Sequence, residues 1–244
     1  MAESRNKKYC CPNSISSKGV IFLEDTAIIE NDNKLLGKTF FWMFLGLLGS
    51  AIIAWYSYSS GIFLSFIENG QYGIVLIIEL ATVLIFNLLY RKLPAAVVGI
   101  LFAIYSMVNG VTLSVIFYVY ELNSIIYLFV ASALVFGILA FIGYNTEKDL
   151  SSWRVYLSVF LIVGLVLSII NLFIGNSTFD LILDWVILLV FLGVTIYDIN
   201  KLKLLASSGE FSDNKIHIYL AMQLYLDFIN IFIRILSIFG KRRD

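Results

Sequence analysis

Seven apolar stretches, separated by short polar breaks, limit what this sequence can fold into. Each is close to the roughly 20 residues that a helix needs to cross the hydrocarbon of a bilayer. The stretches cover residues 39–58, 72–90, 95–120, 124–144, 153–174, 179–199 and 218–239. Inside lipid every backbone group must be hydrogen-bonded within the protein, and continuously apolar runs satisfy this as helices rather than as alternating strands. We therefore predict an all-α membrane protein with seven transmembrane helices.

The composition supports this class and excludes one kind of partner. Hydrophobic residues make up 60% of the chain and charged residues 14%, whereas soluble proteins have about 45–50% and 25%. The 17 basic and 17 acidic residues cancel, so net charge gives no reason to expect nucleic acid. Residues 1–38 lack the apolar core of a signal peptide. We predict a mobile cytosolic leader at 1–38, a transmembrane domain at 39–240 and a short basic tail at 241–244.

Basic residues determine the predicted orientation. Six lie in the leader, seven lie in or beside the second, fourth and sixth breaks, and none lies in the first, third or fifth. Such residues concentrate on the cytosolic side of a membrane. We therefore place the amino terminus and the even breaks in the cytosol, and the Ile-, Asn- and Lys-rich composition favours a bacterial plasma membrane. The basic tail falls on the opposite side, so the last segment either crosses fully, which we favour, or enters and returns.

Ionisable residues inside a membrane are costly and often mark functional sites. Four within the predicted spans stand out, namely Glu79, Asp198, Asp227 and Arg234. In the last span, Gln223, Asp227, Asn230 and Arg234 follow one another at intervals of four, three and four residues. This spacing puts them in one polar stripe on a helix, which must face other helices or a wet cavity. Gln223 and Asn230 are then either a hydrogen-bonded seam between helices or part of a cavity lining.

Asp198 and Asp227 form the predicted centre of the site. Two carboxylates at close range do not both ionise readily, so such a pair binds a proton or a hard cation. Ca²⁺ prefers several oxygen ligands, which two carboxylates, amides and water can supply. We therefore expect the pair to sense protons and to bind calcium, and we expect no other cofactor.

The other candidate residues each have two interpretations. Glu79 is either a further ligand or proton relay, or a buried neutral acid. Asn109 either makes a packing hydrogen bond or lines a cavity. Arg91 either reaches Asp198 or anchors the second span at the cytosolic surface. Arg234 is either an electrostatic barrier towards the outer end of the last span or an interfacial anchor.

Enzymatic readings fail on particular residues. A zinc hydrolase needs several His or Cys ligands, and the chain has one histidine. An intramembrane aspartyl protease of the presenilin type would share the Tyr197-Asp198 dipeptide and an aspartate in the next span. That family requires glycines one and three residues before the second aspartate, where this chain has Leu226 and Leu224. We therefore expect no enzyme.

Several short motifs together resemble the Bax-inhibitor (transmembrane Bax inhibitor motif) family, in its bacterial branch. They are RKLPA at 91–95, YSMVNGVTLS at 105–114, GY at 143–144 leading to KDLSSW at 148–153, NLF at 171–173, YDINK at 197–201 and LYLDFIN at 224–230. The last motif is the most specific. Together they cover the chain from about residue 35 onward.

The resemblance implies a fold in which the last helix is central and the other six surround it. It also implies a pH-sensitive calcium leak whose sensor is a hydrogen-bonded aspartate pair, at Asp198 and Asp227 here. An arginine near the end of the second helix latches the closed state in the family, and Arg91 is the nearest candidate. A different class of function is a non-conducting membrane regulator that binds a membrane protease or another partner. Lipid, calcium and protons are the other expected partners.

The predicted orientation can be tested by labelling single cysteines. Glu68→Cys, Asn123→Cys and Asn176→Cys should react with an impermeant maleimide added outside intact cells, because their breaks carry no basic residue. Ser208→Cys should stay unlabelled. The reverse pattern would contradict the orientation, and an unlabelled Asp244→Cys would indicate a last segment that enters and returns.

Overall fold

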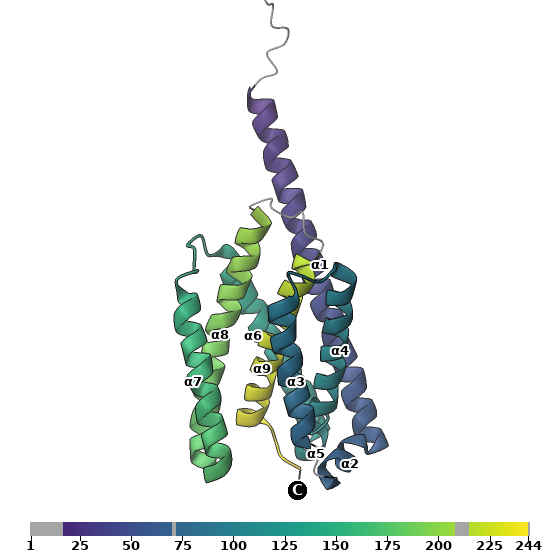
Figure 1. Ribbon diagram of the computed structural model, residues 1–244. Helices are drawn as coiled ribbons and strands as arrows, with labels where there is room; N and C mark the ends of the chain where they lie inside the picture. Colours follow the sequence, from purple (N-terminus) through teal and green to yellow (C-terminus); the bar gives the residue numbers. More distant parts are fainter. Residues whose placement is uncertain (1–16, 70–71, 208–214, 244) are drawn as a thin grey trace, which may run out of the picture.

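The computed structural model describes residues 17–69, 72–207 and 215–243, and within these ranges it is a bundle of helices (Figure 1). The helices are α1 (Ser17–Ser60), α2 (Ile62–Glu68), α3 (Tyr72–Leu89), α4 (Ala95–Leu113), α5 (Ile116–Val119), α6 (Leu122–Asn145), α7 (Trp153–Ile174), α8 (Ser177–Ser207) and α9 (Ile216–Phe239). The predicted all-α class is confirmed.

Six helices of the described chain are long and apolar enough to cross a membrane. They are α9, most of α7, and the ranges Lys34–Ser60, Ala95–Val119, Leu122–Asn145 and Ser177–Ser207. The predicted span at 72–90 corresponds to α3, an apolar helix of 18 residues that is not among these six. The count of seven therefore stays a prediction.

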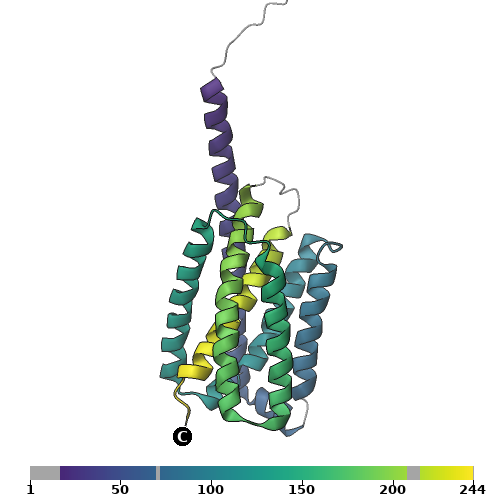
Figure 2. The same ribbon diagram turned by 90° about the vertical axis from the view of Figure 1, so that its left-hand side faces the viewer.

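The last helix is central, as the resemblance implied. α9 packs against α1, α4, α6 and α8, and its ribbon lies between α6 and α8 on one side and α1 and α4 on the other (Figures 1 and 2). Over half (56%) of the residues in its most apolar stretch are buried within the protein, whereas only 6% are buried in the corresponding stretch of the peripheral α7. Its apolar residues therefore pack against protein on nearly every side, and its polar stripe must face partners inside the bundle.

The bundle has two distinct ends. At one end α1 enters, α8 ends at Ser207 and α9 begins at Ile216; we call the other end, where α1 ends at Ser60 and α9 at Phe239, the tail end (Figure 1). The breaks that carry basic residues all lie at the first end, so the structure gathers the charges on which the orientation prediction rests. Its cytosolic assignment stays a prediction.

Two helix boundaries differ most from the sequence-based ones. α1 begins at Ser17, so residues 17–38 of the expected leader are helical, while residues 1–16 lie outside the described chain. α8 continues to Ser207, so Lys201 and Lys203 are helical rather than in a loop. Residues 201–207 contain no Gly or Pro and include Lys, Leu and Ala, which are good helix formers. The predicted span ends at 199 because polar residues follow it, but the helix itself continues through them to Ser207.

Small residues set the closest helix contacts. A Cβ added to Gly110 would lie 2.7 Å from the backbone oxygen of Ser50, so α4 meets α1 on its Gly46-Ser50-Ala54 face. A Cβ added to Gly143 would lie 2.7 Å from the oxygen of Ile196 and 2.9 Å from the Cβ of Ile199. Gly143 therefore lets α6 touch the turn of α8 that carries Asp198. Close approach through small residues is typical of helix packing in membranes.

The two glycines of α6 give a matched stability test. Gly143→Ala should destabilise the protein by about 1–3 kcal/mol, because its new methyl group meets the backbone of α8. Gly137→Ala meets nothing within 4 Å and should be neutral or stabilise by up to about 1 kcal/mol, since alanine is the better helix former. Unfolding of the purified variants in detergent measures both. Equal behaviour would contradict the packing described for α6 and α8.

Candidate functional site

The predicted aspartates line one polar cavity. It has a volume of about 400 Å³ and is bounded mainly by α7, α8 and α9, with Asn87 contributed by α3. Its polar lining residues are Asn87, Arg154, Ser158, Tyr197, Asp198, Lys201, Tyr219, Gln223, Asp227 and Asn230. The stripe predicted on the last helix therefore faces a cavity through three of its four members.

Asp198 of α8 and Asp227 of α9 are both buried, with 6% and 3% of their surface exposed. They lie on neighbouring helices and line the same cavity. The Oδ2 atom of Asp227 is fully buried and has no hydrogen-bond partner among the described residues. An unpaired buried carboxylate oxygen is costly. A proton, a cation or water at this oxygen would relieve that cost.

The positive charge nearest the pair belongs to Lys201, which sequence reasoning had placed in a loop. Its Nζ donates to Oε1 of Gln223 at 3.1 Å and lies 5.5 Å from the centre of the Tyr219 ring. Lys201 interacts electrostatically with both aspartates. Arg154, at the start of α7, also lines the cavity and interacts with Asp198. The extension of α8 beyond residue 199 brings Lys201 into the site.

Arg91 is not beside the pair. Its Nε donates to the hydroxyl of Tyr90 at 3.1 Å, which raises the pKa of the guanidinium, and the side chain is exposed. Its backbone oxygen accepts a hydrogen bond from Lys215 at 2.7 Å. Tyr90 stacks on Tyr219 with the ring centres 3.9 Å apart. Arg91 therefore lies next to the wall of the cavity without reaching either aspartate, and the geometry favours its role as a surface residue.

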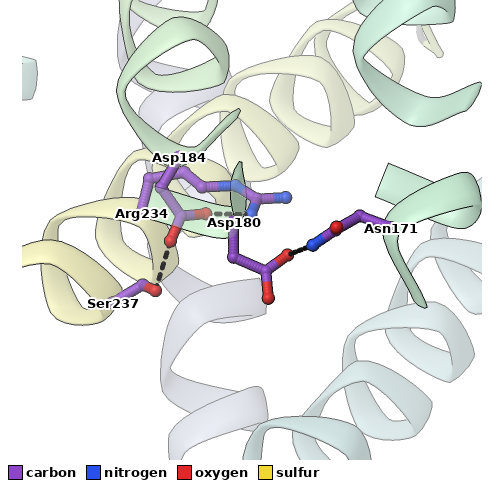
Figure 3. Close-up of polar contacts among 5 residues, drawn as sticks. All are labelled: Asn171, Asp180, Asp184, Arg234 and Ser237. Atoms are coloured by element: carbon purple, nitrogen blue, oxygen red, sulfur yellow. Dashed lines mark hydrogen bonds and ion pairs between the residues drawn. The ribbon is translucent and has the colours of Figure 1, made fainter. Parts of the chain in front are cut away.

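Arg234, the last member of the stripe, forms an ion pair that neither of its predicted roles included. Its NH1 lies 2.5 Å from Oδ1 of Asp184 on α8, and Ser237 donates to the other carboxylate oxygen (Figure 3). The side chains are 27% and 9% exposed, respectively. The Nε atom of Arg234 is buried without a partner among the described residues. This pair ties α8 to α9 near the tail end, and the aspartate pair lies between the same helices towards the other end.

A second carboxylate missed by sequence reasoning lies one turn from Asp184. Asp180 accepts a hydrogen bond from Nδ2 of Asn171, which also donates to the backbone oxygen of Asn176 at 3.1 Å (Figure 3). This contact connects the end of α7 to the start of α8. It stabilises the turn between the two helices and is separate from the cavity.

Glu79 lies in a different polar network from the aspartates. It accepts hydrogen bonds from Asn109 and, at 2.9 Å, from Thr112, both on α4. The Tyr225 hydroxyl donates to Oδ1 of Asn109 at 2.8 Å and lies 2.6 Å from the Ser50 hydroxyl. Asn109 thus makes packing hydrogen bonds, as one of its two interpretations held. The network joins α1, α3, α4 and α9, and none of its members lines the aspartate cavity.

Gln223 and Asn230 have different partners. Gln223 accepts from Lys201 across the cavity, whereas Nδ2 of Asn230 donates to the backbone oxygen of Leu226 within α9 at 2.7 Å. The described residues contain no cluster of three or more His, Cys, Asp or Glu side chains that could hold a metal ion. A calcium ion at the aspartates would therefore depend on two carboxylates, with amide oxygens and water completing its shell.

Depth in the membrane is the signal that would have found Asp184. Neighbouring antiparallel helices bring the start of one to the level of the end of the next. Asp184 lies near the Ser177 end of α8, and Arg234 lies near the Phe239 end of α9. A lone acid and a lone base at matching depth predict a pair, because an unpaired charge in hydrocarbon is expensive. Lys201 carried no such signal, since its helical placement was not expected.

Comparisons with known proteins extend over the whole transmembrane domain. Residues 32–244 match the model of a family described as "Inhibitor of apoptosis-promoting Bax1". The inner membrane protein YbhL of Escherichia coli (strain K12) is 35% identical over 214 residues, which cover 85% of this chain and 92% of YbhL. A protein of Deinococcus radiodurans is 31% identical over 233 residues, covering 94% and 100%. A membrane protein of Streptococcus pyogenes serotype M1 is 38% identical over 167 residues, covering 68% and 72%.

The buried ion pair can be tested with a double-mutant cycle. Arg234→Gln or Asp184→Asn alone should cost about 3 kcal/mol of stability, because each leaves a buried charge without its partner. The double variant should cost less than the sum of the two by at least about 1 kcal/mol. Lys241→Gln is the control, since its ion pair with Glu121 is largely exposed and should contribute less than about 1 kcal/mol. Additive losses at 184 and 234 would mean that the two charges do not interact.

Proposed function

Because this chain belongs to the Bax inhibitor family of multi-pass membrane proteins, we propose that it is a pH-sensitive calcium-leak channel, or a regulator of such a leak, gated by Asp198 and Asp227. The observation that carries the proposal is the cavity that two buried carboxylates from α8 and α9 both line, with one oxygen of Asp227 lacking a partner among the described residues.

Protonation gives the proposed switch. With one shared proton, the two carboxyl groups can hydrogen-bond to each other and hold α8 against α9. Loss of that proton replaces the attraction with repulsion between two anions. The change shifts a closed–open equilibrium only if the two states bind the proton with different affinity. In this proposal, the ion pair between Arg234 and Asp184 keeps the helices together near the tail end while the aspartates separate.

Lys201 is the proposed internal counter-ion, in place of Arg91. Its ammonium lies in the same cavity as the two aspartates and is held by Gln223, one turn before Asp227 on α9. A tethered cation favours the ionised form of the carboxylates and competes with calcium for them. Calcium must displace it or share the cavity with it. This arrangement suits transient binding during a leak, rather than a resident structural ion.

The decisive experiment is calcium flux against pH in proteoliposomes that hold the purified protein. Asp198→Asn and Asp227→Asn should flatten the pH dependence, because neither variant can share a proton between two carboxylates. Asp180→Asn is the matched control, since it removes a carboxylate from the same helix outside the cavity, and it should titrate like the wild type. Wild-type titration in both cavity variants would make the pair structural. An absence of flux through any folded form would favour the non-conducting regulator that binds a membrane protease or another partner.

The counter-ion role has its own test. Lys201→Gln should move the pH midpoint of flux upward by about 1 unit, because the carboxylates lose a positive charge that favours their ionised form. Apparent calcium affinity should rise in the same variant. Lys203→Gln is the control, because Lys203 lies over the Tyr144 ring and donates towards Thr146, away from the aspartates. A midpoint that moves equally in both variants would point to general surface charge.

A further inference from the structure

An apolar groove of about 350 Å³ runs between α1 and α6, far from the polar cavity in character and in lining. We call it the α1–α6 groove. Its lining residues are Leu47, Ser50, Ala51, Ala54, Trp55, Leu113, Ile116, Phe117, Leu122, Ile125, Ile126, Phe129, Val130, Ile229 and Phe232. Thus α1 and α6 form its walls, α9 its floor, and α4 and α5 its end.

The groove exists because two neighbours of α9 do not close over it. Both α1 and α6 pack on α9, yet they are not among the helix pairs of the described chain that pack extensively on each other. Ser50, Ala51 and Ala54 on α1 are too small to fill the gap. Ile126 and Val130 on α6 are about half exposed, at 52% and 53%. The groove therefore opens sideways to the hydrocarbon of the membrane.

Its position along the membrane normal suits an acyl chain. Leu47 to Trp55 rises about 12 Å along α1, which is most of the roughly 15 Å of hydrocarbon in one leaflet. Trp55 packs against Phe117 and Tyr58, with ring centres 5.6 and 5.9 Å apart. Tryptophan and tyrosine concentrate where headgroups meet hydrocarbon. The groove therefore starts at headgroup level at the tail end and runs inward.

The basic tail docks beside that entrance. Tyr120 and Arg242 form an isolated antiparallel bridge, and the backbone N–H of Arg243 donates to Val119 at 2.9 Å. The Arg243 guanidinium donates to the Tyr58 hydroxyl and to the backbone oxygen of Phe117, each at 2.9 Å. These acceptors are uncharged, so no described residue neutralises its positive charge.

The other two basic residues of the tail differ in their neutralisation. Lys241 is paired with Glu121 at 2.5 Å. Arg242 is exposed and has no ion pair among the described residues. The Arg243 guanidinium therefore lies beside Phe117 of the groove lining, with the exposed Arg242 next to it in the chain, and neither has a carboxylate partner among the described residues. A phosphate is the group that such a pair of arginines recognises well.

We propose that the α1–α6 groove binds one acyl chain of an anionic phospholipid, whose phosphate lies against Arg242 and Arg243. The apolar groove holds the acyl chain, and the basic tail of the protein favours a lipid with a negatively charged headgroup. This site is independent of the aspartate cavity and of any transport through it. A helix from a second copy of the protein is the competing occupant.

Native mass spectrometry of the full-length protein in detergent tests the proposal. With phosphatidylglycerol and phosphatidylcholine of identical acyl chains added in turn, the wild type should retain phosphatidylglycerol at least about 5-fold more strongly, a ratio within the range for a charge-assisted contact. The double variant Arg242→Gln/Arg243→Gln should bind both lipids equally. Ala51→Phe, which places a ring in the groove, should lose both.

Two controls keep these outcomes decisive. Val159→Phe adds a ring to the exposed surface of α7, outside the groove, and should bind lipid like the wild type. Unfolding temperature and oligomeric state of every variant should match the wild type, because Ala51 is exposed and the arginines lie in the tail. Equal retention of the two lipids by the wild type, or unchanged binding by Ala51→Phe, would overturn the proposal. A wild-type dimer that Ala51→Phe converts to monomer would overturn it in favour of the second copy.

Discussion

A carboxylate in hydrocarbon must find a positive charge or hydrogen-bond donors, and this requirement organises the interior of the bundle. Asp184 has Arg234 and Ser237, Glu79 has Asn109 and Thr112, and Asp180 has Asn171. The contacts of Asp184 and of Glu79 each join two helices that are far apart in the sequence. The polar contacts therefore determine which helices are neighbours. Apolar packing specifies the neighbours only weakly, because lipid tails offer an apolar side chain a similar environment.

Asp227 departs from this pattern. It lies on the most buried helix, and one of its oxygens lacks a partner in the described part of the chain. Glu79, Asp180 and Asp184 each have donors, whereas one oxygen of Asp227 has none among the described residues, which concentrates an energetic cost at this site. Such costs are retained where a site must respond to protons or ions. Asp227 lies between α8 and α9, which the ion pair of Arg234 and Asp184 also joins near the tail end. In the proposed switch, a change in the charge of Asp227 would therefore alter the interface between these two helices.

The sequence predicted the fold class and the central pair of residues, because both depend on strong, local signals. Twenty-residue apolar stretches have few alternatives in a bilayer, and a four-three-four polar spacing has one helical interpretation. It did not predict Lys201 as part of the site, since a charged residue after an apolar run looks like the start of a loop. The pairing of Asp184 with Arg234 does not follow from the spacing within α9 alone, because it depends on which residue of α8 lies at the same depth in the membrane. The position of Arg91 near the end of an apolar stretch is compatible with a contact to Asp198 and with an anchor at the surface, because it leaves the direction of the side chain open.

The glycine contact between α6 and α8 has a mechanical consequence. At Gly143, α6 lies against the backbone oxygen of Ile196 and the Cβ of Ile199, in the turn of α8 that carries Asp198. A rigid helix held at one interior point behaves as a lever: it can tilt about that point but cannot slide past it. A slight tilt of α8 about this contact would then move its Ser207 end more than its Ser177 end, which the ion pair between Arg234 and Asp184 holds against α9. One of the closest helix contacts in the described chain would thus act as the pivot of that movement.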